Sequence, residues 1–280
     1  MSSAAFSARY RTAFITGASS GLGQAFADML LANGVEVWGT ARDLARLSAR
    51  DKFHAVALEL GDGAAAEKIF LVAEQAAGGF DLVINNAGFG AFGAFADTDF
   101  SIWEEQLRMM LVNTARLSHV ALRGMLARRR GALVNISSLA AEFPLPYQSA
   151  YNMVKSGLSA LNESLMFETA GTGVIVIDFR PGDYRTDFEG SVRRAVGPNL
   201  PAVDPVQAAR QARVWTAFTG MMASGPAPAH AAAALHRSLL RGRSGTVRTG
   251  RFFQAVLGPF LARFGSLALR RRILEKYFGL

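Results

Sequence analysis

The 280-residue sequence contains no cysteine, which excludes disulfide bonds, thiolate metal sites and cysteine nucleophiles. It also lacks any apolar run of the roughly 18 to 20 residues that a membrane-spanning helix needs. Its first residues do not combine a basic start with a long apolar stretch, so we expect neither a membrane span nor a secretion signal. The four histidines, His54, His119, His230 and His236, lack metal-ligand spacing, and we expect no metal site.

Acidic residues are scarce in the last third of the sequence. Residues 1–190 carry 16 basic and 20 acidic side chains, whereas residues 191–280 carry 14 basic and only two acidic ones. The net charge of +8 at pH 7 therefore combines −4 in the first part with +12 in the second. Such a basic region could serve a nucleic acid, an anionic membrane or an anionic substrate. It could also reflect drift toward arginine, which supplies 26 of the 30 basic residues.

Composition and periodicity predict one large globular α/β domain. Half of the residues are hydrophobic and 19% are charged, which suits a sizeable core and excludes general disorder. Short β-rich apolar runs alternate with longer segments of helical periodicity, which predicts βαβ units around a parallel sheet. We expect long helices at residues 100–129 and 149–170, and strands at residues 12–16, 35–40, 54–58, 82–85, 132–136 and 174–179.

The regular alternation ends after residue 180. Between positions 197 and 228 the helical pattern is interrupted by glycine and proline, so we expect a mobile substrate loop there. The interrupting residues are Gly197, Pro198, Pro201, Pro205, Gly225, Pro226 and Pro228. The last 30 residues are helical in composition, with breaks expected at Gly258-Pro259 and at Gly265.

A glycine-rich turn follows the first predicted strand. Residues 16–23 read TGASSGLG and lead directly into an amphipathic helix. In this context Gly17 permits the tight turn, Gly21 and Gly23 let backbone and helix approach closely, and the helix N-terminus faces a pyrophosphate. We interpret the turn as a dinucleotide site, although its spacing is T-G-x-x-x-G-x-G and not the commoner G-x-G-x-x-G. The alternative is that the glycines serve only a tight turn between strand and helix.

The end of the second predicted strand favours NADP(H) over NAD(H) as the cofactor. An acidic residue at this point accepts a hydrogen bond from the ribose 2′-hydroxyl, whereas a basic one pairs with a 2′-phosphate. The sequence has Ala41 where an acid would lie, followed by Arg42, and Ser19 or Ser20 could donate to the same phosphate. Alternatively, Arg42 is a solvent-exposed residue at the start of a helix, and NAD(H) is then the cofactor.

Tyr151 and Lys155 are four residues apart, so on a helix their functional groups lie on one face. A tyrosine, whose unperturbed pKa is about 10, is a poor acid–base catalyst at neutral pH. A nearby ammonium group and the positive charge of an oxidised nicotinamide would lower this pKa toward the working range. Lys155 could also hold the nicotinamide ribose. Ser138, at the end of a strand, could donate a hydrogen bond to the oxygen of a substrate.

Five motifs together resemble the classical short-chain dehydrogenase/reductase family in both order and spacing. They are TGASSGLG at residues 16–23, NNAG at residues 85–88, Asn113, Ser138 with Tyr151-x-x-x-Lys155, and Arg180-Pro181-Gly182 with Thr186. The resemblance covers about residues 10–190 and implies a Rossmann-type, doubly wound parallel β-sheet in a single three-layer α/β/α domain. Residues 1–190 would form the dinucleotide-binding and catalytic core. Residues 191–280 would hold the substrate loop, the last strand and a basic amphipathic extension of the same domain.

The resemblance also implies a role for each matching residue. Tyr151 would be the general acid and base, Ser138 would stabilise the substrate oxygen, and Lys155 would lower the pKa of Tyr151 and bind ribose hydroxyls. Asn113 would hold a water in a proton relay that ends at Lys155, and Ser137 is the alternative to Ser138. At Glu59 the family often has Asp. The cofactor would be held by Gly17, Ser19, Ser20, Gly21, Leu22, Gly23, Arg42, Glu59, Leu60, Asn86, Ala87, Gly88, Tyr151, Lys155, Pro181, Gly182, Tyr184 and Thr186.

These residues predict an NADP(H)-dependent oxidoreductase that interconverts a ketone or aldehyde and an alcohol. Phe89, Phe92 and Phe95 lie among Gly and Ala and suggest an apolar pocket wall for a lipophilic substrate, although core packing explains the rings equally well. One alternative is an enzyme similar to a 3-oxoacyl-(acyl carrier protein) reductase, with a basic rim that docks the acidic carrier. The other alternative is a non-catalytic NADP(H)-binding sensor or scaffold.

The resemblance implies a homodimer or homotetramer packed through the helices at residues 100–129 and 149–170. The basic C-terminal region contains no motif that reads nucleic acid, so we expect no nucleic-acid partner. Its Phe and Leu residues accompany arginines as an interfacial helix requires, which leaves contact with a membrane or an acyl carrier open. The same residues could instead close the substrate pocket or form a subunit interface. We expect a cytoplasmic enzyme, since the cysteine-free composition permits that compartment.

Overall fold

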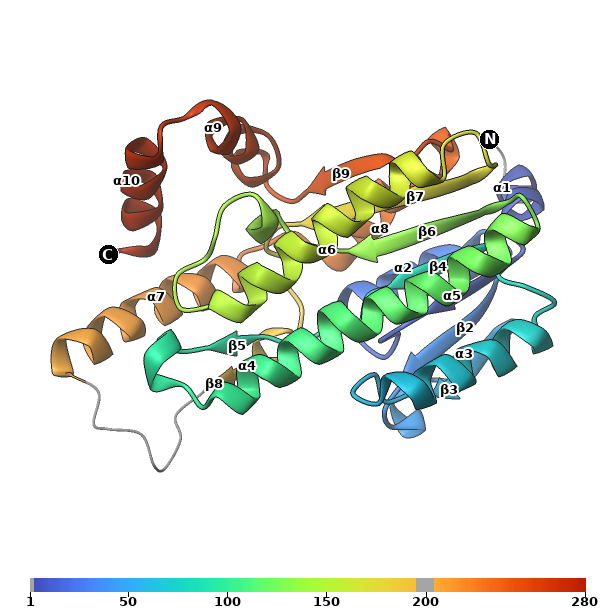
Figure 1. Ribbon diagram of the computed structural model, residues 1–280, viewed down its shortest axis with the longest axis horizontal. Helices are drawn as coiled ribbons and strands as arrows, with labels where there is room; N and C mark the ends of the chain where they lie inside the picture. The colour runs from blue at the N-terminus through green and yellow to red at the C-terminus, as the bar shows by residue number, and fades with distance from the viewer. Residues whose placement is uncertain (1–2, 195–203) are drawn as a thin grey trace.

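The computed structural model describes residues 3–194 and 204–280, which form a seven-stranded sheet covered by helices on both faces (Figure 1). The strand order is β3-β2-β1-β4-β6-β7-β9, and every neighbouring pair is parallel. The strands are β1 (Thr12–Ile15), β2 (Glu36–Ala41), β3 (Phe53–Ala57), β4 (Leu82–Asn85), β6 (Gly131–Ile136), β7 (Val174–Pro181) and β9 (Gly245–Thr249). A separate short pair joins β5 (Ala91–Phe92) to β8 (Arg193–Arg194).

The helices fall into a set beside the sheet and a set near the C-terminus. The first set is α1 (Ser3–Arg9), α2 (Gly21–Ala32), α3 (Gly63–Ala76), α4 (Phe100–Leu107), a π-helical segment (Arg108–Val112), α5 (Asn113–Ala127) and α6 (Ser149–Glu168). The second set is α7 (Pro205–Ala223), α8 (Pro228–Arg241), a π-helical segment (Phe253–Leu257), α9 (Gly258–Phe264) and α10 (Leu267–Phe278). Short 3₁₀ turns are Leu44–Arg46, Phe95–Asp97, Leu139–Ala141 and Glu189–Ser191.

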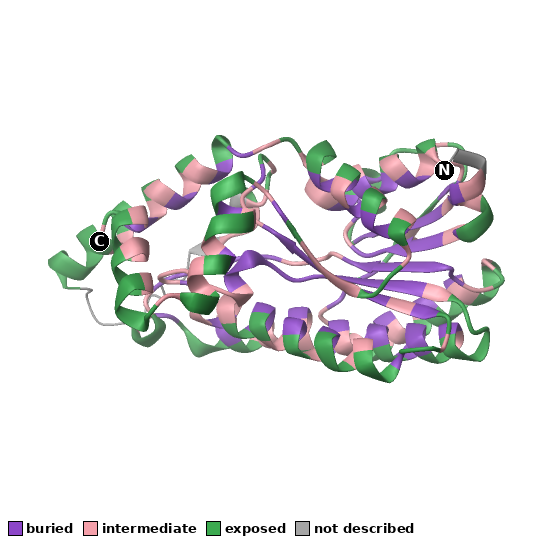
Figure 2. Ribbon diagram, turned by 90° about the horizontal axis from the view of Figure 1, so that it is seen from above, coloured by how far each residue is buried: buried purple, intermediate pink, exposed green. Residues whose placement is uncertain are grey.

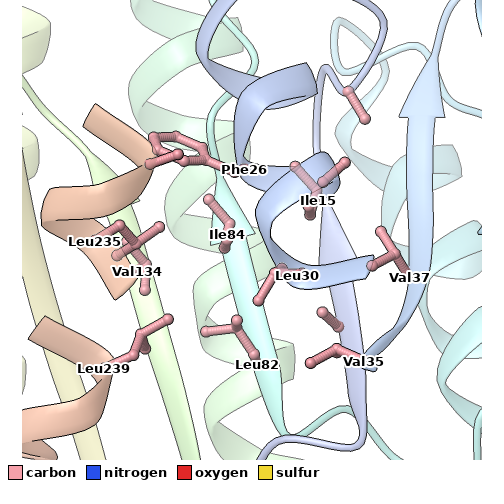
Figure 3. Close-up of a cluster of buried hydrophobic side chains, with 14 of the residues drawn as sticks. Ile15, Phe26, Leu30, Val35, Val37, Leu82, Ile84, Val134, Leu235 and Leu239 are labelled. Atoms are coloured by element: carbon pink, nitrogen blue, oxygen red, sulfur yellow. The ribbon is translucent and has the colours of Figure 1, made fainter. Parts of the chain in front are cut away.

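Side chains from the central strands alternate between the two faces of the sheet, because successive residues of a strand point in opposite directions. On one face, Ile84 and Val134 pack with Phe26 of α2 and Leu235 of α8, as Figure 3 shows. On the other face, intervening strand residues such as Val83 pack against α3 and α5. The purple ribbon of the strands in Figure 2 shows that the sheet forms the buried middle layer. The predicted three-layer α/β/α fold is therefore confirmed.

All six predicted strands are present, each within two residues of its expected bounds. The predicted helix at residues 100–129 is one helical stretch made of α4, the first π-helical segment and α5. The predicted helix at residues 149–170 is α6. The position of the last strand of the main sheet, β9, was not predicted, because its sequence GTVRT is short and largely polar.

The expectation of an irregular segment up to residue 228 is wrong from residue 204 onward, since α7 and α8 fill most of this region. Pro205 and Pro228 each lie in the first turn of a helix, where the N–H that proline lacks has no intrahelical partner. Gly225 and Pro226 lie in the connection between the two helices. The other interrupting residues, Gly197, Pro198 and Pro201, lie outside the described residues.

One of the two breaks expected near the C-terminus is also wrong. Gly258-Pro259 does not interrupt the helix, because the π-helical segment continues into α9 and Pro259 lies in the first turn of α9. Gly265 does end α9, as expected, and Ser266 caps the start of α10 by accepting a hydrogen bond from Leu269 N. Within the described residues, no helix combines the length and the apolar character needed to cross a bilayer.

The topology fixes where a ligand can bind. β1 and β4 are neighbours in the sheet, although β2 and β3 lie between them in the sequence. The chain therefore reverses its direction across the sheet at this point, and such folds bind ligands outside the carboxyl ends of the strands there. In Figure 1, α9 and α10 lie beyond the same ends of the strands.

Candidate active site

A cavity of about 1120 Å³ lies at the carboxyl ends of the strands. It is bordered by the loops that follow β1, β2, β4, β6 and β7, by α6 and α7, and by the C-terminal helices. Most single-ligand pockets measure about 300–1,000 Å³, so this one can hold a dinucleotide together with a substrate. The structure brings together all of the site residues predicted from the sequence except Gly23 and Asn113, which do not line the cavity.

The turn after β1 forms a cradle for a phosphate. Gly17 has a φ of +69°, which disfavours other residues, and its N–H donates to Thr40 Oγ1 at 3.1 Å. Gly23 lies one turn into α2, where a Cβ atom would come within 2.0 Å of the Gly17 carbonyl oxygen. Asn86 Nδ2 holds the same carbonyl oxygen at 3.0 Å. Gly23 therefore lets α2 approach the turn and does not itself border the cavity.

The N-terminus of α2 points its positive dipole end toward this cradle. Ser20 precedes the helix, and its side chain makes no capping hydrogen bond. Ser19, Gly21 and Leu22 line the cavity beside it. Backbone N–H groups and the helix dipole at such a terminus favour an anion. The glycine cradle and the uncapped helix together fit the pyrophosphate of a nicotinamide dinucleotide.

The far end of the cavity is basic. Arg42 directly follows β2, is exposed and lines the cavity, whereas Ala41 is buried at the end of the strand. Arg46, from the 3₁₀ turn after β2, lines the same end. Sequence reasoning missed Arg46, although it lies four residues after Arg42 in the same loop. The carboxylate of Glu59 accepts a hydrogen bond from Gly61 N at 2.9 Å and so shapes its own loop.

Asn113 lies apart from the catalytic group. Its side-chain amide is buried and donates to the carbonyl oxygens of Leu60 at 2.7 Å and Gly61 at 3.2 Å. The relay ending at Lys155 that the resemblance implies thus has no support from this side chain. Met110, in the π-helical segment, lines the cavity and packs in one cluster with Tyr151. Asn113 instead fixes the loop after β3 at the adenosine end.

Replacing Asn113 with Ala should therefore weaken cofactor binding more than it slows the chemical step. Two backbone carbonyl groups lose a buried donor, which costs roughly 1–3 kcal/mol and loosens the loop that carries Glu59 and Leu60. We expect the KM for the dinucleotide to rise roughly tenfold, with kcat changed by less than about twofold. Steady-state kinetics at saturating substrate measure both constants. A large fall in kcat at an unchanged KM would support the relay instead.

Ser138, Tyr151 and Lys155 lie together on the cavity wall, and Ser138 follows the carboxyl end of β6. Ser138 and Tyr151 share a side-chain hydrogen bond. Lys155 Nζ donates to Ile136 O at 2.7 Å and lies 5.5 Å from the centre of the Tyr151 ring. Ser137, the alternative to Ser138, also borders the cavity, but its hydroxyl donates to the buried carboxylate of Asp178. The geometry therefore places Ser138 beside the phenol.

Burial is the largest influence on the pKa values of Tyr151 and Lys155. Burial raises the pKa of Tyr151 to about 12; the hydrogen bond with Ser138 lowers it and the charge of Asp183 raises it. Burial lowers the pKa of Lys155 to about 8, against the charge of Asp178, which raises it. At pH 7 Tyr151 carries its proton, which is the form that can donate to a carbonyl oxygen.

Sequence reasoning missed a buried ionic network beneath the catalytic group. Asp178, in β7, is fully buried and accepts hydrogen bonds from Ser159 Oγ at 2.9 Å and Asn162 Nδ2 at 3.1 Å. It also pairs with Arg180 Nε at 2.7 Å, and Arg180 reaches Glu142 at 2.7 Å. An acid inside the apolar run VIVIDF was the available signal, since a buried carboxylate needs partners.

The apolar wall differs from the one predicted. Phe89 lines the cavity, but Phe92 is buried between Tyr147 and Trp215, and Phe95 is exposed and stacks on Trp103. The rings of Phe92 and Phe95 therefore do not form the wall. Most of the wall comes from other elements. Its apolar members include Met109, Met110, Leu139, Phe143, Leu145, Phe188, Phe218, Met221, Met222, Phe253, Leu261, Leu267, Ile273, Leu274 and Phe278.

Gln254 ties the C-terminal helices to the cavity. Its side-chain amide donates to the carboxylate of Asp183 and to Tyr277 Oη, the latter at 3.1 Å. Its carbonyl oxygen accepts from Asp183 N at 3.3 Å. Asp183 follows Gly182 in the turn after β7, so one buried side chain joins α10 to the loop beside Tyr151. Of the roles considered for this segment, pocket closure agrees with these contacts.

Comparison with known proteins shows which family most of this chain resembles. The family model described as short chain dehydrogenase matches residues 11–197. A short chain dehydrogenase of Pseudocercospora fijiensis is 32% identical over 188 residues, which are 64% of this chain and 61% of that protein. A 3-oxoacyl-(acyl-carrier-protein) reductase of Vibrio harveyi is 28% identical over 201 residues, 69% of this chain and 82% of that protein.

Solved structures share the fold over more of the chain. A short-chain dehydrogenase from Streptomyces avermitilis superposes with a TM-score of 0.80 at 27% identity, covering 94% of this chain and 97% of that one. A Burkholderia phymatum enzyme in complex with NAD (TM-score 0.74, 24% identity, 85% and 88% covered) has the same fold. So has a Sphingobium yanoikuyae enzyme in complex with NADPH (TM-score 0.67, 23% identity, 84% and 86% covered).

The matched region contains the phosphate cradle, the catalytic group and six of the seven strands of the main sheet. The C-terminal segment, from α7 onward, lies beyond the family model. This chain belongs to the short chain dehydrogenase family and is an NAD(P)-dependent oxidoreductase acting on CH–OH and C=O groups.

Proposed function

We propose that the protein reduces a lipophilic ketone or aldehyde to an alcohol with NADPH. The observation that carries this proposal is the convergence of a protonated Tyr151, Ser138 and Lys155 on one cavity. That cavity has a basic adenosine end at Arg42 and a largely apolar wall elsewhere. The cofactor, when bound, supplies the hydride that is added to the carbonyl carbon. The protein then has to bind, orient and protonate the substrate.

Tyr151 donates its proton from Oη to the carbonyl oxygen as that oxygen gains negative charge. Ser138 Oγ, which already shares a hydrogen bond with Tyr151, stabilises the same oxygen. Lys155 donates one N–H to Ile136 O, and its two remaining N–H groups can donate to ribose hydroxyls. Its positive charge stabilises the phenolate that proton transfer leaves behind.

The protonation states favour the reductive direction at neutral pH. Reduction needs the phenol, and burial keeps the pKa of Tyr151 far above 7. Oxidation needs the phenolate, so the rate of oxidation should increase as the pH rises. The rate of reduction should decrease as the pH rises, first because Lys155 loses its proton near its pKa of about 8. In the cytoplasm, the location we propose, a reduced NADPH pool would drive the same direction.

The preference for NADP(H) rests on the basic adenosine end. Arg42 and Arg46 both line it, no acidic residue ends β2, and the hydroxyl-bearing Ser19 and Ser20 border the same space. A guanidinium group pairs with a phosphate through charge-assisted and often bidentate hydrogen bonds. A 2′-phosphate would therefore gain contacts here that a 2′-hydroxyl cannot make.

Replacing Arg42 with Ala should remove much of this preference. Hydrogen bonds to charged groups are worth about 1.5–3 kcal/mol, so we expect the KM for NADPH to rise roughly tenfold or more. The KM for NADH should change by less than about twofold, because a 2′-hydroxyl makes no ion pair. Steady-state kinetics with both cofactors measure the ratio. Arg241→Ala, an exposed cation at the opposite edge of the sheet, is the control; an unchanged NADPH preference in Arg42→Ala would contradict the assignment.

A 3-oxoacyl-(acyl carrier protein) reductase is the second candidate function. It is favoured by the likeness to the Vibrio harveyi enzyme and by Arg270 and Arg271, which line the cavity and could meet an acidic carrier. Turnover of a panel of lipophilic ketones, aromatic ketones and carrier-linked 3-oxoacyl thioesters separates the two candidates. Preference for the carrier-linked substrate over the free thioester would select the second.

We also propose a homo-oligomer packed through the helical stretch of residues 100–129 and through α6. Val112 of the first stretch and Met153 of α6 are 54% and 46% exposed, and Phe167, near the end of α6, is 84% exposed. Large apolar side chains at this level of exposure are typical of a subunit interface. Sedimentation velocity of the purified chain tests the proposal, and a monomer at micromolar concentration would exclude it.

A further inference from the structure

The C-terminal segment, residues 251–280, has an inner side and an outer side. Its inner side lines the cavity through Leu261, Leu274 and Phe278, among others. Its outer side is apolar and exposed: Phe252, Val256, Phe260 and Phe264 are 76%, 53%, 58% and 69% exposed. In Figure 2 much of the ribbon beside the C-terminus is drawn as exposed. This division is unusual, because the cavity alone would account only for the inner set.

The exposed apolar residues form a stripe. Phe252, Val256, Phe260 and Phe264 follow one another at intervals of four, so they lie along one side of the π-helical segment and α9. The rings of Phe260 and Phe264 lie 5.0 Å apart between centroids. Of the 18 large hydrophobic side chains that are exposed in the described residues, eight lie within residues 252–269. Such a concentration marks a contact surface.

Cations accompany the stripe. The segment carries five arginines and one lysine, against Glu275 as its only carboxylate. Arg251, Arg263, Arg271, Arg272 and Lys276 are exposed, and the guanidinium of Arg263 lies 5.9 Å from the centre of the Phe264 ring. Large apolar side chains combined with arginines that can reach past them are what an interfacial helix needs on an anionic bilayer.

We propose that residues 251–280 dock the enzyme on a membrane surface that contains anionic lipids. Phe252, Val256, Phe260 and Phe264 would enter the boundary between headgroups and acyl chains. The arginines would contact lipid phosphates. A second copy of the chain fits less well, because a symmetric contact would bring the same cations of both copies together. An anionic bilayer supplies both the apolar volume and the charge complement.

The docking surface has a consequence that rests on the proposed function. Leu261 and Ala262 line the cavity within the same helix that carries Phe260 and Phe264. A docked enzyme would therefore hold its apolar cavity wall next to the bilayer. A lipophilic ketone dissolved in lipid would reach Tyr151 without crossing bulk water.

Sedimentation of the full-length protein with vesicles tests the docking surface without any substrate, so its outcome does not depend on the reaction. One set of vesicles contains phosphatidylcholine alone, and the other contains equal parts of phosphatidylcholine and phosphatidylglycerol. We expect binding to the anionic set only, weakened at high salt because surface charges are screened. Phe260→Ser/Phe264→Ser and Arg263→Glu/Arg272→Glu should each lower the affinity roughly tenfold or more.

Two control variants carry the same kinds of substitution outside residues 251–280. Leu71→Ser/Val72→Ser removes two exposed apolar side chains from α3, and Arg241→Glu/Arg243→Glu reverses two exposed cations before β9. Both should bind vesicles like the wild type. Absence of binding, or equal loss in the controls, would overturn the proposal. So would a dimer that Phe260→Ser/Phe264→Ser dissociates when no vesicle binding occurs, which would assign the stripe to a second copy.

Discussion

Replacing Tyr151 with Phe should lower kcat for carbonyl reduction by about 10²- to 10⁴-fold while NADPH still binds. The substitution removes one hydroxyl, which is the proposed proton donor, and leaves the ring and its packing with Phe89 and Met110 in place. In the proposed binding mode, the cofactor is held mainly by the cradle at Gly17 and by the basic end of the cavity at Arg42, which the substitution does not touch. Stopped-flow or steady-state kinetics measure turnover, and fluorescence titration with NADPH measures binding.

Tyr147→Phe is the matched control, because Tyr147 loses the same hydroxyl but does not line the cavity. It should keep near wild-type turnover. Full activity in Tyr151→Phe would exclude Tyr151 as the proton donor. If instead the wild type binds NADPH but turns over none of the substrate panel, and Tyr151→Phe keeps the biological output, the chain is a sensor or scaffold.

Replacing Asp178 with Ala should lower the free energy of unfolding by about 3–5 kcal/mol. The carboxylate is fully buried and holds Arg180, Ser137, Ser159 and Asn162, so its removal leaves a buried cation and three polar side chains short of a partner. Urea denaturation at a fixed protein concentration measures the change. Asp51→Ala, at an exposed carboxylate, should change stability by less than about 0.5 kcal/mol.

The same residue also acts on catalysis through charge. Asp178 raises the pKa of Lys155, and burial lowers it. Asp178→Asn keeps the volume and removes the charge, so the pKa of Lys155 should fall below its value of about 8. The loss of reductive kcat/KM with rising pH should then begin at lower pH than in the wild type. An unchanged pH profile together with unchanged stability would show that the network is dispensable.

The parts of the fold that depend on local pattern could be predicted from the sequence. β1, β2, β4, β6 and β7 are buried on both faces, so they read as continuous apolar runs bounded by turns. β9 could not be located in this way, because its sequence is polar and it lies at the edge of the sheet. β9 is a strand because it pairs with β7. The two strands are far apart in the sequence, so their pairing leaves no pattern in the residues around β9.

In the candidate site, too, the features that depend on local sequence were the predictable ones. Motifs within one loop or one helical turn, such as the cradle at Gly17 and the pair Tyr151 and Lys155, were predicted as the structure places them. Asn113 differs, because its role came from the resemblance alone, whereas in the structure it follows a π-helical segment and its amide contacts the loop after β3. For the C-terminal segment the sequence left pocket closure, an interface and membrane contact open, since only the tertiary fold shows that α7 and α10 lie over the strands.

Gln254 also sets a condition for building chimeras between related enzymes. Its amide bridges Asp183 and Tyr277, and a side chain at Gly182 would place a Cβ atom 2.6 Å from its carbonyl oxygen. A C-terminal segment grafted from a parent that lacks Gln254 would therefore leave Asp183 without this contact. A functional exchange of substrate preference has to transfer two separate pieces, the tail and the turn at residues 182–183, from the same parent.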